Sequence, residues 1–289
     1  MLNTIRPAHR RQTAAFCLFV ALSGCASISG VTTSSLDGRN VEHFVTGHGT
    51  PAVVFENGLG GRLQWWAEVL PTIARETTVF AYNRAGTGSS TEASTPRDGE
   101  TIIDELRRNL RDKDIAPPYV LVGHSLGGLY MQLYARRYPQ EVAGLVLVDS
   151  THPEQLKGAG AKDNWPTWIK LMFNVLLSDA ASKELEALPA TGATMLALPP
   201  LTGKPVVILS AQKPMSETSE LARDANAKRS DIARLHPGAK QVWVDSGHVI
   251  PLERPDAVIA AIHEVLLSVQ AAQSHSPSTG GNETGEIQK

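Results

Sequence analysis

Six short apolar runs recur along the middle of the chain, and they constrain its fold more than any other feature. Each is largely uninterrupted by charged residues, and they lie at 52–57, 78–83, 119–124, 144–149, 205–210 and 240–245. Such runs are typical of strands buried on both faces of a parallel sheet. Stretches with helical periodicity separate them, at about 65–75, 100–112, 126–138, 219–235 and 254–271. This alternation predicts an α/β fold with a doubly wound, mostly parallel sheet.

The same pattern predicts how the chain is divided. Residues 41–46 alternate like an edge strand, and residues 41–150 with 204–272 are expected to form the α/β core. The interval 151–203 breaks the alternation with Trp165, Trp168 and a Pro-rich end, which predicts a small helical lid. The polar segment 25–40 is interpreted as a tether and 273–289 as a disordered tail.

The first 25 residues resemble a targeting segment. Arg6, Arg10 and Arg11 precede the apolar run 13–22, which is too short to span a bilayer as a mature helix. The sequence LSGC follows at 22–25 and resembles the lipobox of bacterial lipoproteins. This resemblance implies a signal peptide at 1–24 and a lipid on the Cys25 thiol, which would anchor the protein in the bacterial cell envelope.

Two details refine that expectation. The anchor would hold the protein on the periplasmic side of a membrane, and Ala26 resembles a signal for the outer membrane rather than the inner one. The alternative is an ordinary secretory signal peptide that is cleaved near Cys25.

Charge and cysteine content exclude several classes of function. The 289 residues carry a formal net charge of −2 and no basic stripe, so no nucleic-acid partner is expected. The two cysteines are Cys17, inside the predicted signal peptide, and Cys25. The mature chain therefore has no cysteine nucleophile, disulfide or cysteine-ligated metal. We expect a monomer that contacts the membrane only through its lipid.

The strongest chemical motif is GHSLG at 123–127. It is a G-x-S-x-G sequence between a predicted strand and a predicted helix, which is the context of a nucleophile elbow. A sharp turn there would lift the Ser125 hydroxyl above the sheet, and the flanking glycines would let strand and helix approach closely. Ser125 is therefore the candidate nucleophile.

A glycine-rich loop, ENGLGG at 56–61, follows the strand at 52–57. An oxyanion hole needs backbone N–H groups directed at developing negative charge. We expect one from Leu126, directly after the nucleophile, and one from Leu59 in this loop. A loop that binds a nucleotide phosphate is not expected, because no Gly-Lys-Ser/Thr sequence follows.

His248 lies after the last predicted strand and before a helix, later in the chain than Ser125. This order fits a general base that activates the serine and then donates a proton to the leaving group. His124 should point away from the nucleophile and serve in packing or hydrogen bonding. His152 is left as either a lid-base residue or a pocket residue.

These motifs together resemble the α/β-hydrolase superfamily over residues 41–271. The matching segments are ENGLGG, YNRAGTGSS, VGHSLGG, GLVLVD and DSGHVIPLERPDAV. The resemblance implies an acyl-enzyme mechanism without metal or organic cofactor. The sequence departs from the family pattern at Glu56-Asn57, where relatives have an apolar residue and His, and at Asn83, where they have Asp.

A third departure concerns the triad acid. Many relatives have Asp at the position of Pro214, and proline cannot orient an imidazole. Some relatives take the acid from the end of the strand that follows the elbow helix, where this chain has Asp149. Asp149 is the candidate acid, with Glu217 and Glu220 as alternatives. Asp245 is disfavoured because it precedes His248 too closely.

The sequence thus predicts a serine hydrolase that cleaves an acyl bond, most simply a carboxylic ester of a small molecule. An acyltransferase, or a hydrolase of amides, thioesters or lactones, would use the same triad. A non-catalytic envelope lipoprotein is the remaining alternative, although neither Ser125 nor His248 is degenerate. Epoxide hydrolases and haloalkane dehalogenases share the fold but have Asp where this chain has Ser125.

Overall fold

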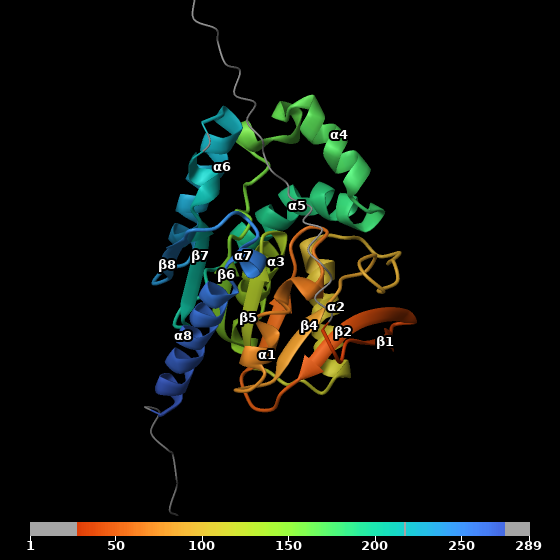
Figure 1. Ribbon diagram of the computed structural model, residues 1–289, viewed down its shortest axis with the longest axis vertical. Helices are drawn as coiled ribbons and strands as arrows, with labels where there is room; N and C mark the ends of the chain where they lie inside the picture. Colours follow the sequence, from red (N-terminus) through yellow and green to blue (C-terminus); the bar gives the residue numbers. More distant parts are fainter. Residues whose placement is uncertain (1–27, 217, 275–289) are drawn as a thin grey trace, which may run out of the picture.

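The computed structural model describes residues 28–216 and 218–274. These residues form a sheet of eight strands flanked by helices (Figure 1). The strands are β1 Thr32–Leu36, β2 Arg39–Thr46, β3 Ala52–Glu56, β4 Val79–Tyr82, β5 Tyr119–His124, β6 Val142–Val148, β7 Val206–Ala211 and β8 Lys240–Val244. Their order across the sheet is β1-β2-β4-β3-β5-β6-β7-β8. β1, β2 and β4 pair antiparallel, and every pair from β4 to β8 is parallel.

Helices cover both faces of this sheet. They are α1 Leu70–Ile73, α2 Gly99–Asp112, α3 Leu126–Arg137, α4 Thr167–Leu176, α5 Asp179–Ala197, α6 Glu220–Asp231, α7 Ile250–Glu253 and α8 Pro255–Ser274. On one face, α2, α3 and α5 pack a core that includes Leu106, Leu129 and Leu185. On the other, α1 and α8 pack a second core that includes Ile73 and Ile262. The α/β class with a mostly parallel sheet is as the sequence predicted.

The buried strands explain why the apolar runs were continuous. All residues of β3, β4, β5, β6 and β7 are buried, because both faces of the central sheet carry helices. α8 is apolar and long enough to cross a membrane, but its Val258, Ile262 and Val265 side chains are buried against the second core.

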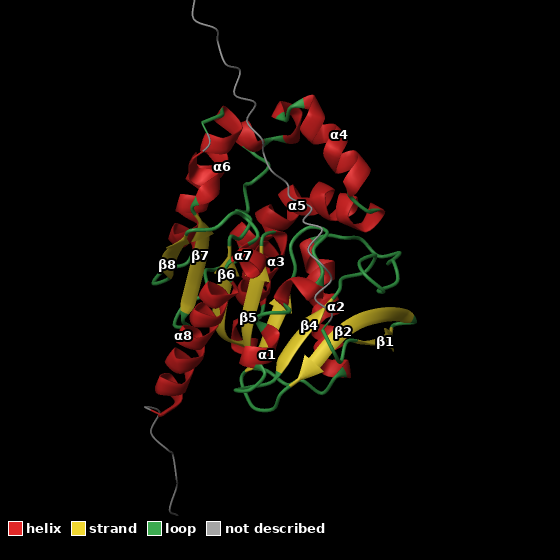
Figure 2. Ribbon diagram, viewed as in Figure 1, coloured by secondary structure: helices red, strands yellow, loops and turns green. Residues whose placement is uncertain are grey.

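Helices α4 and α5 occupy the interval that was expected to form a lid. Figure 2 shows them beyond one end of the strands, together with α6. Ser178 begins α5 as an N-cap, since its hydroxyl accepts a hydrogen bond from the N–H of Ala181. α5 packs against α2 and α3, which attaches this part of the interval to the core.

The tether prediction for residues 25–40 is wrong from residue 32 onwards. Residues 32–46 form a β-hairpin whose turn is Asp37-Gly38, both with positive φ, of 51° and 75°. An Asp-Gly pair between two strands favours this turn, because both of its residues must adopt positive φ. The turn lets β1 and β2 pair although most of their side chains are polar. As a consequence β1, not β2, is the edge strand.

Candidate active site

Ser125 lies in a tight turn between β5 and α3, with φ 52° and ψ −123°. The turn depends on two glycines. A side chain at Gly123 would come within 2.6 Å of the Gly127 carbonyl oxygen, and one at Gly127 within 2.4 Å of the Asn57 carbonyl oxygen. Strand and helix are therefore too close for any larger residue, and the positive φ holds Ser125 at the carboxyl end of β5.

The structure brings Ser125, His248 and Asp149 into one hydrogen-bonded chain. The Ser125 Oγ lies 2.9 Å from Nε2 of His248, and Nδ1 of His248 lies 2.6 Å from Oδ2 of Asp149. His248 comes from the loop between β8 and α7, and its side chain is 43% exposed, whereas that of Asp149 is fully buried. The imidazole thus connects a buried carboxylate to a hydroxyl that a substrate can approach.

Asp149 directly follows β6 and has a φ of 38°. Its Oδ1 accepts hydrogen bonds from the N–H of Ala211, at 3.0 Å, and from Nε of Arg229, at 2.7 Å, while Nη2 of Arg229 lies 3.2 Å from Oδ2. Burial alone would raise the pKa of Asp149, but the hydrogen bonds and positive charge of His248 and Arg229 outweigh it and hold the pKa well below its usual value. Asp149 is therefore ionised at neutral pH.

His124 is buried and supports the loop that carries His248. Its Nε2 lies 2.9 Å from the His248 carbonyl oxygen, and the two rings are 4.9 Å apart. Burial, with a smaller contribution from the nearby His248, lowers the pKa of His124 to about 3. The ring is therefore neutral, and the hydrogen bond requires the proton on Nε2. This hydrogen-bonding duty agrees with the expectation from the sequence.

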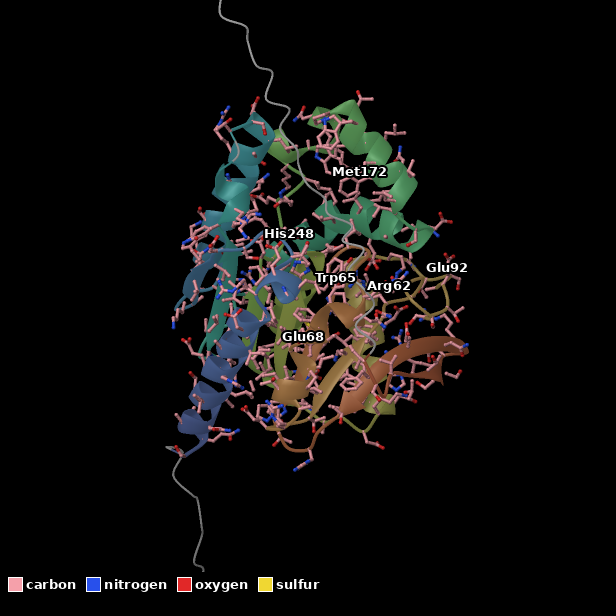
Figure 3. All side chains as sticks on the ribbon, viewed as in Figure 1. Arg62, Trp65, Glu68, Glu92, Met172 and His248 are labelled. Carbon is pink, nitrogen blue, oxygen red and sulfur yellow. The ribbon has the colours of Figure 1, made fainter. Side chains whose placement is uncertain are left out.

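The glycine-rich loop packs against this site. A side chain at Gly58 would lie 3.1 Å from Cβ of Ser125, so the loop backbone borders the serine directly. Within the described residues, neither the N–H of Leu59 nor that of Leu126 has a hydrogen-bond acceptor. Trp65 follows the loop, and its ring centroid lies 5.6 Å from that of His124. Figure 3 shows Trp65 and His248 below Met172 of α4.

Comparison with known proteins identifies the family. The family model of the alpha/beta hydrolase fold matches residues 51–255, which include all three members of the hydrogen-bonded chain. The chain belongs to the α/β-hydrolase family.

Several relatives of this α/β-hydrolase chain are similar over most of their length. The uncharacterized protein YqjL of Bacillus subtilis is 33% identical over 225 residues, covering 74% of this chain and 82% of YqjL. A (lyso)-N-acylphosphatidylethanolamine lipase from mouse is 27% identical over 252 residues, covering 73% of this chain and 71% of the lipase.

Solved structures of α/β hydrolases agree on the fold. A thermophilic esterase from Thermogutta terrifontis superposes with a TM-score of 0.57 at 22% identity, covering 83% of this chain and 97% of the esterase. A haloalkane dehalogenase variant from Bradyrhizobium elkanii reaches 0.64 at 15% identity, covering 84% and 98%. Because enzymes of different chemistry share the fold, the reaction must be argued from the site residues.

None of the other carboxylates considered for the triad of this α/β hydrolase is placed beside His248 within the described residues. Glu220 begins α6 on the surface, Asp245 is exposed after β8, and the structure does not describe Glu217. Pro214 lies in a short 3₁₀ helix after β7. Cys25 and the predicted signal peptide also fall outside the described residues.

His152 connects the start of the segment expected to form a lid to α6. The ring is buried, its Nε2 lies 3.2 Å from Oδ2 of Asp231, and its Nδ1 accepts a hydrogen bond from the N–H of Glu154. Burial lowers the pKa of His152, against the opposing effect of Asp231. Of the two roles left open by the sequence, the lid-base role fits these contacts.

The departures from the family pattern take part in a buried polar network. Asn83 accepts a hydrogen bond from the N–H of Leu63 and donates one to Glu42. Asn57 donates to the carbonyl of Tyr82, and Glu56 accepts hydrogen bonds from Tyr82 and Arg84. Burial raises the pKa of Glu56, although Arg84 opposes that shift.

Sequence reasoning missed Arg229 and Glu184. Arg229 is 80 residues from Asp149 in the chain, on a helix with no motif of its own, so no local signal indicated the pairing. Glu184 lies on α5, 100 residues from its partner Arg84. In the described residues, no group of three or more His, Cys, Asp or Glu side chains forms a metal-binding cluster.

Proposed function

We propose that this chain is a serine hydrolase that cleaves an acyl bond, most simply a carboxylic ester of a small molecule. The observation that carries the proposal is the hydrogen-bonded chain from Ser125 through His248 to Asp149, which has the order and distances of a catalytic triad. The mouse relative named a lipase supports ester cleavage.

In this proposal the residues act in sequence. His248 accepts the Ser125 proton as the hydroxyl oxygen attacks the carbonyl carbon of the ester. The backbone N–H groups of Leu59 and Leu126 stabilise the oxyanion that forms. His248 then donates its proton to the leaving alcohol, and water, activated by the same imidazole, hydrolyses the acyl-enzyme.

Asp149 has two roles in this mechanism. It holds Nδ1 of His248 in the protonated tautomer, which leaves Nε2 free to accept the serine proton, and it stabilises the imidazolium. Arg229 and the Ala211 N–H keep the carboxylate ionised and in place.

A fluorophosphonate probe tests the nucleophile, because such probes form a covalent adduct only with activated serines. We expect labelling of the wild-type protein and complete loss of it in Ser125→Ala. Ser150→Ala is the matched control, since Ser150 lies nearby but its hydroxyl bonds Gln132 instead of a histidine. Undiminished labelling of Ser125→Ala would remove the serine from its proposed role.

The bond type is tested separately. A chromogenic ester panel with acyl chains of graded length should show turnover that Ser125→Ala abolishes. The same measurement is made with amide, thioester and lactone substrates, and with an acceptor alcohol to detect acyl transfer. Faster turnover in one of those measurements than with every ester would replace ester cleavage as the activity.

We also propose that the protein works as a lipid-anchored enzyme of the bacterial envelope, attached through Cys25. The support is the LSGC sequence after a short apolar run.

A further inference from the structure

Arg84 is a buried arginine in the loop after β4, and all five of its N–H groups have acceptors. Its Nε donates to Oε1 of Glu184 at 2.9 Å, and its Nη2 donates to Oε2 of Glu184 at 2.7 Å. Its Nη1 donates to Oε1 of Glu56 and to the Asn57 carbonyl, both at 2.6 Å. The remaining Nη2 hydrogen bond goes to the Gly58 carbonyl at 2.9 Å. A guanidinium with every donor engaged is fixed in position and plane.

The Gly58 carbonyl belongs to the same peptide group as the N–H of Leu59. Outside two proline bonds, the described peptides are trans, so this carbonyl and this N–H point in opposite directions. The carbonyl points at Arg84, and the peptide borders Ser125 at Gly58. The same carbonyl also accepts a hydrogen bond from the N–H of Gly61, at 3.1 Å. Arg84 and this turn together fix how the peptide plane is oriented, and the charge of Arg84 polarises the N–H on the far side.

Glu184 holds the opposite edge of the guanidinium from the lid. It lies on α5, and its two carboxylate oxygens accept from Nε and Nη2 of Arg84 in a bidentate pair. Both side chains are almost completely buried, at 3% and 2% exposure. A buried charge pair of this kind is costly to disturb, which makes the arginine a rigid support for the loop.

We propose that Arg84 is the positioning residue of the oxyanion hole, orienting and polarising the Gly58–Leu59 peptide whose N–H stabilises the oxyanion. This inference rests on the proposed serine-hydrolase function. Arg84 itself does not touch substrate. Its effect should therefore be seen in the stabilisation of the transition state and not in the binding of the ground state.

The test compares Arg84→Met with Arg84→Lys in the detergent-solubilised full-length protein. We expect Arg84→Met to lower kcat by roughly 10- to 100-fold with little change in KM, because loss of an entire oxyanion donor costs about 10²–10³. Arg84→Lys should recover part of kcat, since an ammonium can reach one carbonyl but does not reproduce the fork.

An alkylboronic acid gives a second readout. Its boron accepts a lone pair of the Ser125 oxygen, the hydroxyl proton passes to His248, and the adduct is tetrahedral with a B–O group in the oxyanion hole. The affinity for this probe should fall by the same factor as kcat in Arg84→Met. A merely structural defect would not produce that match.

Arg97→Met is the matched control. Arg97 is equally buried in the same charge cluster and bonds Glu105 at 2.8 Å, with Glu184 3.8 Å away, but it makes no hydrogen bond to residues 57–59. We expect it to lower the thermal midpoint while leaving kcat and boronate affinity unchanged. Equal losses of kcat in Arg84→Met and Arg97→Met would overturn the proposal, as would full boronate affinity in Arg84→Met.

Two further results have defined meanings. If Arg84→Met does not fold, Arg84→Lys decides, and wild-type kcat and boronate affinity in that variant would refute the role of the fork. If the wild-type protein binds neither fluorophosphonate nor boronate, the serine-hydrolase proposal itself fails, independently of Arg84.

Discussion

At the scale of single residues, Asp149 is the most heavily constrained side chain of the candidate site. It is buried and ionised, and it bonds an imidazole, a guanidinium and a backbone N–H. Its backbone is also in the left-handed region, which is unfavourable for a residue with a side chain. Strain of this kind persists where the surrounding structure enforces it, and such positions concentrate at functional sites.

Asp149→Asn should reduce kcat severely, by up to about 10⁴-fold, with little change in KM. The amide keeps the shape of the carboxylate but cannot stabilise an imidazolium or hold the required tautomer. Glu220→Gln is the control, because Glu220 is exposed at the start of α6 and should leave kcat unchanged. Steady-state kinetics with a chromogenic ester measure both variants. An active Asp149→Asn protein would transfer the role of the acid to another residue.

His124 predicts a pH dependence of stability. Its pKa is lowered to about 3 in the folded chain, so the unfolded chain binds the proton more readily at any pH between that value and about 6.5. His124 therefore leaves the free energy of unfolding unchanged at pH 8. It lowers that free energy increasingly as the pH falls below about 6.5. The expected loss between pH 8 and pH 5 is about 2 kcal/mol from this histidine.

His124→Gln isolates that effect, since an amide can keep the bond to the His248 carbonyl but does not titrate. Urea unfolding from pH 7.5 to 5 should show a smaller decrease in the free energy of unfolding for the variant. The same decrease in both proteins would show that His124 does not titrate as its burial implies.

The site residues differed in how far the sequence could predict them. Ser125 lies in a G-x-S-x-G motif between a strand and a helix, and His248 follows the last strand later in the chain. These local features were enough to select both residues. Asp149 could be selected only through the resemblance to relatives that take their acid from the end of the same strand. Arg229, and the pairing of Glu184 with Arg84, depend only on tertiary packing between distant segments, which leaves no local pattern to read.

At the scale of elements, the junction of β5 and α3 depends on the missing side chain of Gly127. Gly127→Ala would place a methyl group 2.4 Å from the Asn57 carbonyl oxygen and 2.5 Å from that of Glu56. Both oxygens belong to backbone that cannot move independently of the sheet. We expect a loss of several kcal/mol of stability together with lost activity, because the shift would displace the oxyanion loop as well as Ser125.

Chemical denaturation followed by tryptophan fluorescence measures this loss. Val242→Ala, at a partly buried apolar position on β8 away from Ser125, provides a comparison for an ordinary sheet substitution. Wild-type stability in Gly127→Ala would mean that strand and helix can separate more easily than their close contact indicates.

The prediction of helices and strands succeeded where hydrophobic periodicity was strong. It failed where a proline or a turn sequence determined the local structure. α2, α3 and α8 lie close to the expected ranges. The helix expected at 65–75 is instead a 3₁₀ turn, Leu63–Trp66, followed by the four-residue α1, which Pro71 helps to begin. The hairpin at 32–46 was not predicted because the polar residues before position 41 were interpreted as a tether. The Asp37-Gly38 pair, which favours a hairpin turn, was the local indication of it.

At the scale of the whole molecule, the lipid anchor remains a prediction that can be tested directly. Cys25→Ala should abolish incorporation of a tagged fatty acid in growing bacteria and release the protein from the membrane fraction. The single thiol expected in the mature chain makes this a simple comparison, with Ser23→Ala as a control that keeps a small residue in the motif. Continued labelling of Cys25→Ala would refute the lipobox interpretation.

The order of elements along the chain has a consequence for modularity. The candidate acid Asp149 and the start of the lid are separated by one residue, and Thr151 is held to the elbow by the bond from its N–H to the Ser125 carbonyl. If the acid followed β7 instead, a lid inserted after β6 could be replaced without altering the residues next to the acid. In this chain, a recombination breakpoint at the start of the lid falls between residues that contact Ser125 and the candidate acid Asp149. Substrate range in this lineage should therefore evolve by substitutions within the lid, and not by replacement of the lid as a unit.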